Sequence, residues 1–190
     1  MAAVVGIDRE SLIDAGVAVL NAEGRLDAVG LRPVAERLGI RIQSMYAHVD
    51  GVDGLRRALS LRGLHELAER LTTAAIGRAG ADAISAIVHA YCDFALERPG
   101  LFDATLVPPG EDLEILAAMA LVSRPLNLVF ASCGLDNTDS IHWYRIVFST
   151  IHGFTALRRD GRLTLDADPD VTLERIIAMF ITSLGLEQHE

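Results

Sequence analysis

The sequence contains no lysine, so all 17 of its basic residues are arginine. Schiff-base enzymes, pyridoxal phosphate enzymes and Walker A phosphate loops all need a side-chain primary amine, and these classes are excluded. Cysteine is also scarce, because only Cys92 and Cys133 are present and neither lies in a Cys-x-x-Cys or Cys/His pattern. The sequence therefore predicts buried thiols rather than a disulfide or zinc framework, with no metal and no other cofactor.

Long apolar segments are missing as well. The longest stretch without a formal charge, 146–157, has twelve residues, whereas a helix that spans a bilayer needs roughly 18. The N-terminal residues have no basic side chain before their short apolar run, unlike a secretory signal. We therefore expect a soluble, cytoplasmic protein with no membrane partner.

Positive charge is in deficit overall, but it is unevenly distributed. The chain carries 26 acidic residues and a net charge of −9, which argues against non-specific coating of nucleic acid. Residues 30–62 differ, because they hold six arginines against three acids, a local net charge of +3. The charge in this stretch favours contacts with phosphate groups.

Apolar residues recur at helical spacing along almost the whole chain, and no run of β-branched and aromatic residues is bracketed by hairpin turns. The pattern predicts an all-α fold, with a first helix that is capped by Asp8 and ended by Gly24. Proline, glycine and aspartate breaks delimit the remaining helices. Their expected ranges are 31–38, 42–48, 53–76, 82–98, 111–132 with a kink at Pro125, 137–158 and 170–185.

The second and third of these helices form a pair with a known pattern. An apolar stripe at positions i, i+3, i+4 and i+7 marks the first member, which Gly39 ends with a left-handed stop. A second short helix follows directly. Two short helices joined by a three- or four-residue turn are typical of a helix-turn-helix, which presents its second helix to the major groove of DNA.

These residues resemble the tetracycline-repressor (TetR) family of bacterial regulators. Residues 31–40 are similar to the second helix and turn of that family, and residues 42–49, Ile-Gln-Ser-Met-Tyr-Ala-His-Val, to its recognition helix. Residues 94–102 and 152–157, with Trp143 upstream, resemble one branch of its C-terminal domains. Three positions depart from the family's pattern. Gly30, at the cap of the second helix, and Arg41, at the start of the recognition helix, replace the small hydroxyl residues that are usual there. Val52, after the recognition helix, replaces the usual lysine.

The resemblance implies a helix-turn-helix DNA-binding domain over residues 1–52 and an effector-binding and dimerisation domain over 53–190. We expect exposed residues at the start of the second short helix to contact base edges, with Tyr46 and His48 on phosphate oxygens. The open alternative is that Tyr46 and His48 only cap a small three-helix core. The predicted DNA-binding residues are Arg32, Arg41, Ile42, Gln43, Ser44, Tyr46 and His48, and further phosphate contacts are expected from Arg37, Arg56 and Arg57.

The C-terminal helices indicate a homodimer and a ligand site. Residues 141–157 have two apolar faces, and pairing of the helices at 137–158 and 170–185 in a four-helix bundle satisfies both. Polar side chains on these otherwise apolar helices are expected to line a pocket for a small apolar effector, although core packing is an alternative role for His89, Asp93 and His152. The predicted ligand-binding residues are His89, Asp93, Phe94, Phe102, Met119, Trp143, Phe148 and His152.

These features support a leading hypothesis and an alternative. The leading hypothesis is a repressor that releases a palindromic operator when its effector binds. The alternative is a helical ligand-binding or dimerisation module that has lost specific DNA binding. Enzyme patterns are weak, since His65-Glu66 lacks the second histidine of a zinc protease helix and Ser149 with His152 lacks an oxyanion loop. We therefore predict no enzymatic activity.

Overall fold

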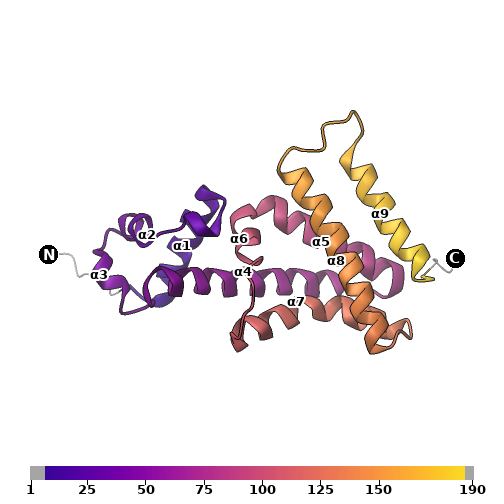
Figure 1. Ribbon diagram of the computed structural model, residues 1–190, viewed down its shortest axis with the longest axis horizontal. Helices are drawn as coiled ribbons and strands as arrows, with labels where there is room; N and C mark the ends of the chain where they lie inside the picture. The colour runs from indigo at the N-terminus through magenta and orange to yellow at the C-terminus, as the bar shows by residue number, and fades with distance from the viewer. Residues whose placement is uncertain (1–6, 187–190) are drawn as a thin grey trace. The chain divides into compact units, whose positions relative to one another are not determined.

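The computed structural model describes residues 7–186, and within this range it contains helices and no strand (Figure 1). The predicted all-α class is confirmed. Residues 1–6, where we expected no secretory signal, lie outside the described range. The α-helices are α1 Arg9–Glu23, α2 Leu31–Leu38, α3 Ile42–Met45, α4 Gly51–Ala75, α5 Gly80–Glu97, α6 Pro99–Ala104, α7 Leu113–Ser132, α8 Asn137–Arg159 and α9 Pro169–Ser183, with a 3-10 turn η1 at Leu26–Ala28.

Helix α1 begins and ends where the residue types predict. The Asp8 carboxylate accepts a hydrogen bond from the Ser11 N–H at 2.8 Å, and Gly24 ends the helix with a φ of 73°. An aspartate at this position satisfies one of the free amide groups of the first turn, and glycine adopts a positive φ without steric cost. The helix buries Leu12 and Leu20 completely.

Some predicted boundaries are wrong. The break expected at Pro99 and Gly100 is present, because α5 ends at Glu97, but a short helix that was not predicted, α6, starts directly at Pro99, where the missing N–H costs little. The helix predicted over 42–48 is too long, because the N–H groups of His48 and Val49 both donate to the Met45 carbonyl and turn the chain. Helix α7 continues through Pro125, so the kink expected there stays a prediction.

The described chain divides into two compact units. Unit 1 comprises the residues up to Leu64 together with Arg98–Ile115, so it contains α1 to α3, η1, the first half of α4, and α6. Unit 2 comprises His65–Glu97 and the residues from Leu116 onward, so it contains the rest of α4, α5, most of α7, α8 and α9. The predicted boundary between residues 52 and 53 separates a DNA-binding part from an effector-binding part. A division of the chain by packing does not test that boundary, which stays a prediction.

Close backbone contacts hold α6 inside unit 1, where it packs against α1. A Cβ atom at Gly100 would lie 2.5 Å from the Leu20 carbonyl oxygen, and one at Gly63 would lie 2.7 Å from the Leu101 carbonyl oxygen. Only glycine allows two helices to approach this closely. The Asp103 carboxylate also accepts a hydrogen bond at 2.8 Å from the Leu26 N–H of η1.

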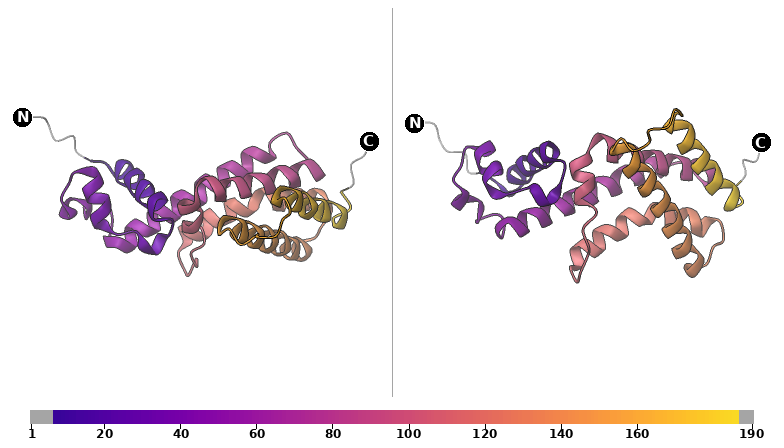
Figure 2. Two further views of the ribbon diagram at one scale, coloured as in Figure 1. Left: turned by 90° about the horizontal axis from the view of Figure 1, so that it is seen from above. Right: turned by 45° about the horizontal axis from the view of Figure 1, so that its top comes forward.

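Apolar contacts dominate the core of unit 2, where α5 packs against both α8 and α9 (Figure 2). Phe94, Phe130 and Phe180 are completely or almost completely buried. Helix α9 buries one apolar face, whose most buried members are Leu173, Ile177 and Phe180. The expectation of buried thiols holds for Cys92, whereas Cys133 is only partly buried.

Candidate DNA-binding and effector sites

The turn between α2 and α3 has helix-turn-helix geometry. Gly39 adopts a φ of 66°, and the Ile40 N–H donates to the Ala35 carbonyl at 3.0 Å, which closes α2 and redirects the chain. Val34 and Met45 are completely buried and hold the two helices against the core of unit 1. The turn and the two helices were therefore predicted correctly from sequence, apart from the length of α3.

The outer face of α3 carries the residues that were predicted to contact DNA. Arg41 precedes α3, and Arg41, Gln43 and Ser44 are exposed, while Ile42 is half-buried. Tyr46 follows the helix with 59% of its surface exposed, and His48 is half-buried. The structure therefore brings these residues together on one short segment, and their contact with DNA stays a prediction.

Several arginines of the basic segment bind groups of the protein itself. Arg32 pairs with Glu36 at 2.8 Å on the exposed side of α2. Arg62 pairs with Glu10 and Asp14 of α1. Arg56 donates hydrogen bonds to the carbonyl oxygens of Asp27, within η1, and of Val29, which directly follows it. Local acids therefore offset part of the charge excess that the sequence places in residues 30–62.

Arg57 makes the most extensive of these pairings. Its Nε and Nη2 atoms donate to the two carboxylate oxygens of Asp112 at 2.5 and 2.9 Å, and Nη2 also reaches Glu114 at 2.7 Å. The guanidinium lowers the pKa of Asp112 to about 2, because its hydrogen bonds stabilise the ionised carboxylate. Arg57 was expected to contact phosphate, but in this structure it joins α4 to the residues that begin α7.

In unit 2, a cluster of aromatic and polar side chains lies between α5 and α8. Tyr91 Oη lies 3.1 Å from His152 Nδ1. The Phe148 ring stacks on Tyr144 and on His152 with centroid distances of 5.6 and 5.8 Å. Burial raises the pKa of Tyr91 and lowers that of His152, because both charged forms lose contact with water. Phe148 and His152, both predicted ligand-binding residues, therefore form part of one packed, neutral cluster.

Other predicted ligand-binding residues lie apart from this cluster. His89 Nε2 contacts Glu174 of α9 at 2.8 Å. Asp93 is exposed, and the Phe94 ring lies under the Arg70 guanidinium, 5.3 Å from it. These three residues therefore face different surroundings.

The other predicted ligand-binding residues do not lie in one site either. Met119 and Trp143 are half-buried in unit 2. Phe102 is buried in unit 1, whose core it fills. A single pocket formed by all eight predicted residues is therefore not present within either unit, and the role of each stays a prediction.

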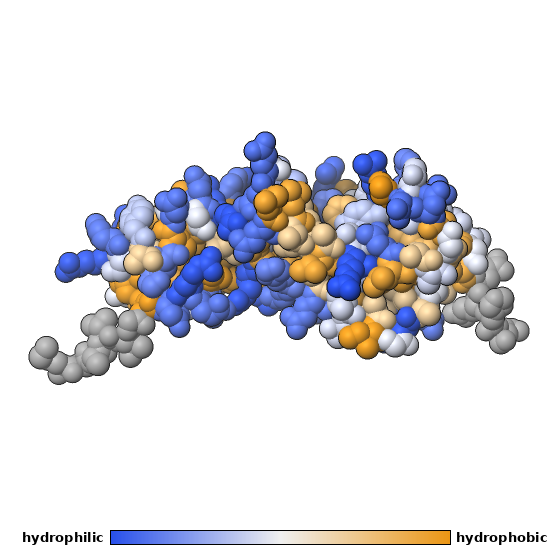
Figure 3. All heavy atoms as spheres, turned by 90° about the horizontal axis from the view of Figure 1, so that it is seen from below, coloured by the Kyte–Doolittle hydropathy of each residue, from blue (hydrophilic) through white to orange (hydrophobic). Residues whose placement is uncertain are grey.

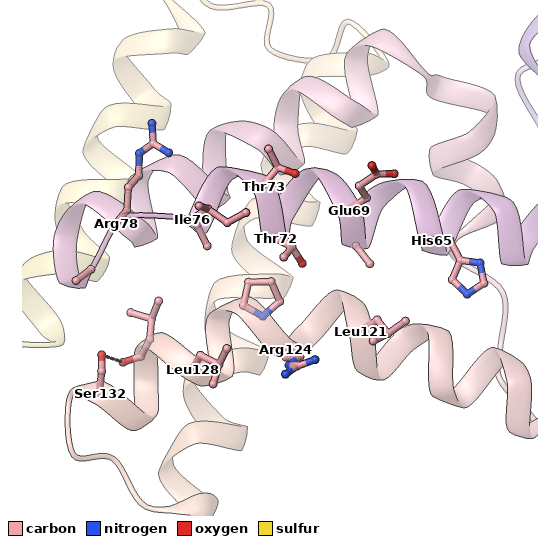
Figure 4. Close-up of a pocket in the computed structure, with 15 residues that line it drawn as sticks. His65, Glu69, Thr72, Thr73, Ile76, Arg78, Leu121, Arg124, Leu128 and Ser132 are labelled. Carbon is pink, nitrogen blue, oxygen red and sulfur yellow. Dashed lines mark hydrogen bonds between the residues drawn. The ribbon is translucent and has the colours of Figure 1, made fainter.

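The structure shows a groove in unit 2 between the C-terminal part of α4 and helix α7, with a volume of about 790 Å³ (Figure 4). This volume lies within the range of small-molecule sites. None of the eight predicted ligand-binding residues is among its lining residues. The apolar and small lining residues are Ala68, Thr72, Thr73, Ala75, Ile76, Ala79, Leu121, Pro125, Leu128, Val129 and Ser132.

One pattern in the sequence accompanies this groove, although it falls outside the predicted ligand-binding residues. Ala68, Thr72 and Ala75 are small and recur at i, i+4 and i+7, so they share one face of α4. Small side chains on one face leave space opposite the neighbouring helix. The space itself depends on where α7 packs, and periodicity does not specify that.

The structure also allows a search for metal-binding clusters and for helices that could span a membrane. Among residues 7–186, no group of three histidine, cysteine, aspartate or glutamate side chains is placed to hold a metal ion. By length and composition alone α7 is apolar enough to cross a membrane, although a core helix of a soluble protein passes the same test. On the face drawn in Figure 3, apolar surface lies in patches among polar side chains.

The helix-turn-helix and the helical unit beside it in sequence define a class of protein, the helix-turn-helix regulators, and comparisons with known proteins specify the family. Residues 84–180 match the family described as "Tetracyclin repressor-like, C-terminal domain". The uncharacterized HTH-type transcriptional regulator Rv0681 of Mycobacterium tuberculosis is 31% identical over 173 residues, which cover 90% of this chain and 78% of that protein. The uncharacterized HTH-type transcriptional regulator YobS of Bacillus subtilis is 27% identical over 180 residues, 95% of this chain and 94% of that protein.

Solved structures share the fold. A protein of unknown function from Rhodococcus sp. RHA1 superposes with a TM-score of 0.79 at 22% identity, over 99% of this chain and 100% of that one. The regulator FadR of Bacillus subtilis, solved in complex with stearoyl-CoA, superposes with a TM-score of 0.70 at 12% identity, over 91% and 97% of the two chains. This chain belongs to the TetR family of transcriptional regulators.

Proposed function

We propose that this protein is a ligand-responsive, DNA-binding transcriptional regulator that acts in the cytoplasm as a homodimer and has no enzymatic activity. Residues 1–52 bind a palindromic operator, and residues 53–190 bind the effector and pair the two copies. The observation that carries the proposal is the exposed outer face of α3, anchored by the buried Met45. Membership of the TetR family supports it.

In this proposal α3 enters the major groove. Arg41 donates two hydrogen bonds to guanine and Gln43 pairs with adenine, because these side chains match the edges of those bases. Tyr46, with its exposed ring, and His48 bind phosphate oxygens and orient the helix. Arg32 adds a phosphate contact: its guanidinium leaves the Glu36 carboxylate, with which it pairs in this structure, and binds a phosphate oxygen of the DNA instead.

Exposed apolar side chains on α8 and α9 support a dimer. Ile141 and Ile146 on α8, and Val171 and Met179 on α9, are each roughly half exposed, although large aliphatic side chains favour burial. Pairing of the two helices with those of a second copy covers them in a four-helix bundle. Two-fold symmetry then presents α3 twice to a palindromic site.

The effector acts through a shift in population. It binds more tightly to the form in which the two copies of α3 do not match the operator, and a coupling of about 1 to 3 kcal/mol is usual for such systems. Helix α4 is the expected lever, because this one continuous helix contributes to both units. FadR of Bacillus subtilis, which has the same fold, was solved with stearoyl-CoA bound.

The test is a mobility-shift titration of the full chain with the DNA upstream of its own gene, at graded salt. Site-specific affinity should fall steeply as salt rises from about 50 to 200 mM, with a slope near −0.9 per phosphate contact. The variant Arg41→Ala should lose roughly 5- to 100-fold of the specific affinity. Arg162→Ala, which removes one exposed charge from the loop before α9, is the matched control and should bind as the wild type does.

The alternative, a ligand-binding or dimerisation module without specific DNA binding, has its own supporting observation. Gly30 and Arg41 leave α2 and α3 without a side-chain hydrogen bond at their N-terminal caps. Such a module would show no site-specific retention at any salt concentration. Unchanged operator preference in Arg41→Ala would contradict the base contact that we assign to this residue.

A further inference from the structure

We propose that the groove between α4 and α7 binds a small, mostly apolar molecule that carries an anionic group, and that Arg124 pairs with this group. This inference rests on the proposed function only in so far as the bound molecule is the effector. It assigns the ligand to residues other than the predicted ones, since neither His152 nor Phe148 lines the groove.

The walls of the groove favour an apolar occupant. Thr72 extends from α4 toward α7, where Leu121 and Leu128 stand opposite (Figure 4). Leu128 is 61% exposed, and Ile76 is also largely exposed at the same end. Covering these side chains removes apolar surface from water, which is favourable in proportion to the area.

The charges around the groove specify the sign of the polar group. Among the described lining residues the one acid is Glu69, and its side chain extends on the side of α4 away from α7 (Figure 4). Arg78 donates to the Ala74 carbonyl at the end of α4. Arg124, by contrast, is exposed on α7 beside Pro125 and lines the groove. Its planar guanidinium can hold a carboxylate by two parallel hydrogen bonds.

The shape of the site favours a compact molecule over a protein surface. A hollow of about 790 Å³ has the volume of a small-molecule site, whereas an interface between protein copies is built from flatter, wider contacts. The exposed leucines of α7 make a second copy of the chain the competing occupant, and the experiment includes that outcome.

The experiment is isothermal titration of the full chain with three probes that share one chain length: decanoate, decan-1-ol and decylammonium. Decanoate should bind most tightly and decylammonium least. Arg124→Gln should weaken decanoate roughly five-fold, the scale of a charge-assisted contact at a partly exposed site, and leave decan-1-ol unchanged. Arg162→Gln makes the same change of charge outside the groove and should alter neither.

A second variant adds a negative charge to the wall of the groove at the exposed residue Leu128. Leu128→Glu should weaken decanoate and strengthen decylammonium. Ala75→Phe should fill the groove and weaken all three probes, with circular dichroism confirming that the variant is folded. Equal affinities for decanoate and decan-1-ol in the wild type, or no effect of Arg124→Gln, would overturn the inference.

Three further outcomes separate this inference from a dimer interface and from the proposed function. If Ala75→Phe alters self-association in sedimentation but not decanoate binding, the groove is an interface between protein copies and the inference fails. If decanoate binds through Arg124 while the upstream DNA is not retained, the ligand site stands and the proposed function fails. If the upstream DNA is bound specifically but decanoate does not bind, the proposed function stands and the inference about the groove fails.

Discussion

Units 1 and 2 are both helical, but different contacts hold their elements in place. In unit 1, polar pairs and backbone approach supplement the apolar core: Arg57 binds Asp112, and Gly100 lies against α1. In unit 2, buried aromatic side chains such as Phe180 dominate, beside the pairs of Tyr91 with His152 and of His89 with Glu174, and an apolar groove stays open. The close approach of α6 to α1 leaves no room for an added Cβ, whereas the groove leaves open space beside α4 and α7. All residues that line this groove belong to unit 2.

The largest effect is expected for Phe180→Ala in unit 2. The side chain is 1% exposed, so its removal leaves a cavity and should cost about 3 to 5 kcal/mol of the free energy of unfolding. Urea unfolding followed by circular dichroism measures this loss, and the fluorescence of Trp143, the single tryptophan, follows unit 2. Met179→Ala, at a neighbouring but half-exposed position, is the control and should cost much less. Equal losses in the two variants would contradict the assignment of Phe180 to the core.

Gly100→Ala should have the next largest effect, in unit 1. The added Cβ would lie 2.5 Å from a backbone oxygen of α1, so α6 must shift, at a cost of about 1 to 3 kcal/mol. The urea midpoint by circular dichroism should fall, while that of Trp143 fluorescence should move less if the units unfold separately. A variant as stable as the wild type would show that the close approach of α6 to α1 is not needed.

Arg57→Gln tests the polar contacts of unit 1, with a smaller effect at neutral pH than that of Gly100→Ala. Because Arg57 lowers the pKa of Asp112 from 3.8 to about 2, the pair stabilises the folded state above pH 3.8. This contribution is lost as the pH falls from about 3.8 through about 2, where Asp112 becomes protonated in the folded state. Thermal unfolding across that range should therefore show a smaller loss of stability in Arg57→Gln than in the wild type. Parallel pH profiles would argue against the pair.

The smallest effect, of opposite sign, is expected for Gly153→Ala. Gly153 lies inside α8 with nothing within 4 Å of an added Cβ. Alanine should therefore stabilise the helix by about 0.5 to 1 kcal/mol, because it loses less backbone entropy on folding. Thermal unfolding of Gly153→Ala beside Gly100→Ala compares the same substitution in both units. A loss of stability that depends on protein concentration would instead indicate that a second copy packs against this position.

Local patterns account for what was predicted correctly. Asp8 and Gly24 delimit α1 through contacts within four residues, and Gly39 ends α2 in the same way. The pocket prediction had no such basis. It added Phe102 as an apolar neighbour of polar side chains such as His152 on otherwise apolar helices, although Phe102 belongs to unit 1. Periodicity identifies the face of a helix but does not specify which other helix that face contacts.

The sequence by itself determined the all-helical class, the caps of the first helices, the helix-turn-helix and its exposed face, because these depend on contacts between near neighbours in the chain. Only the tertiary structure decided that Arg57 binds Asp112, 55 residues away, and that α6 packs in unit 1. The groove is likewise a tertiary feature, since α4 and α7 contribute its two walls. Contacts between distant segments depend on how helices pack, and many packings are compatible with the same helical periodicity.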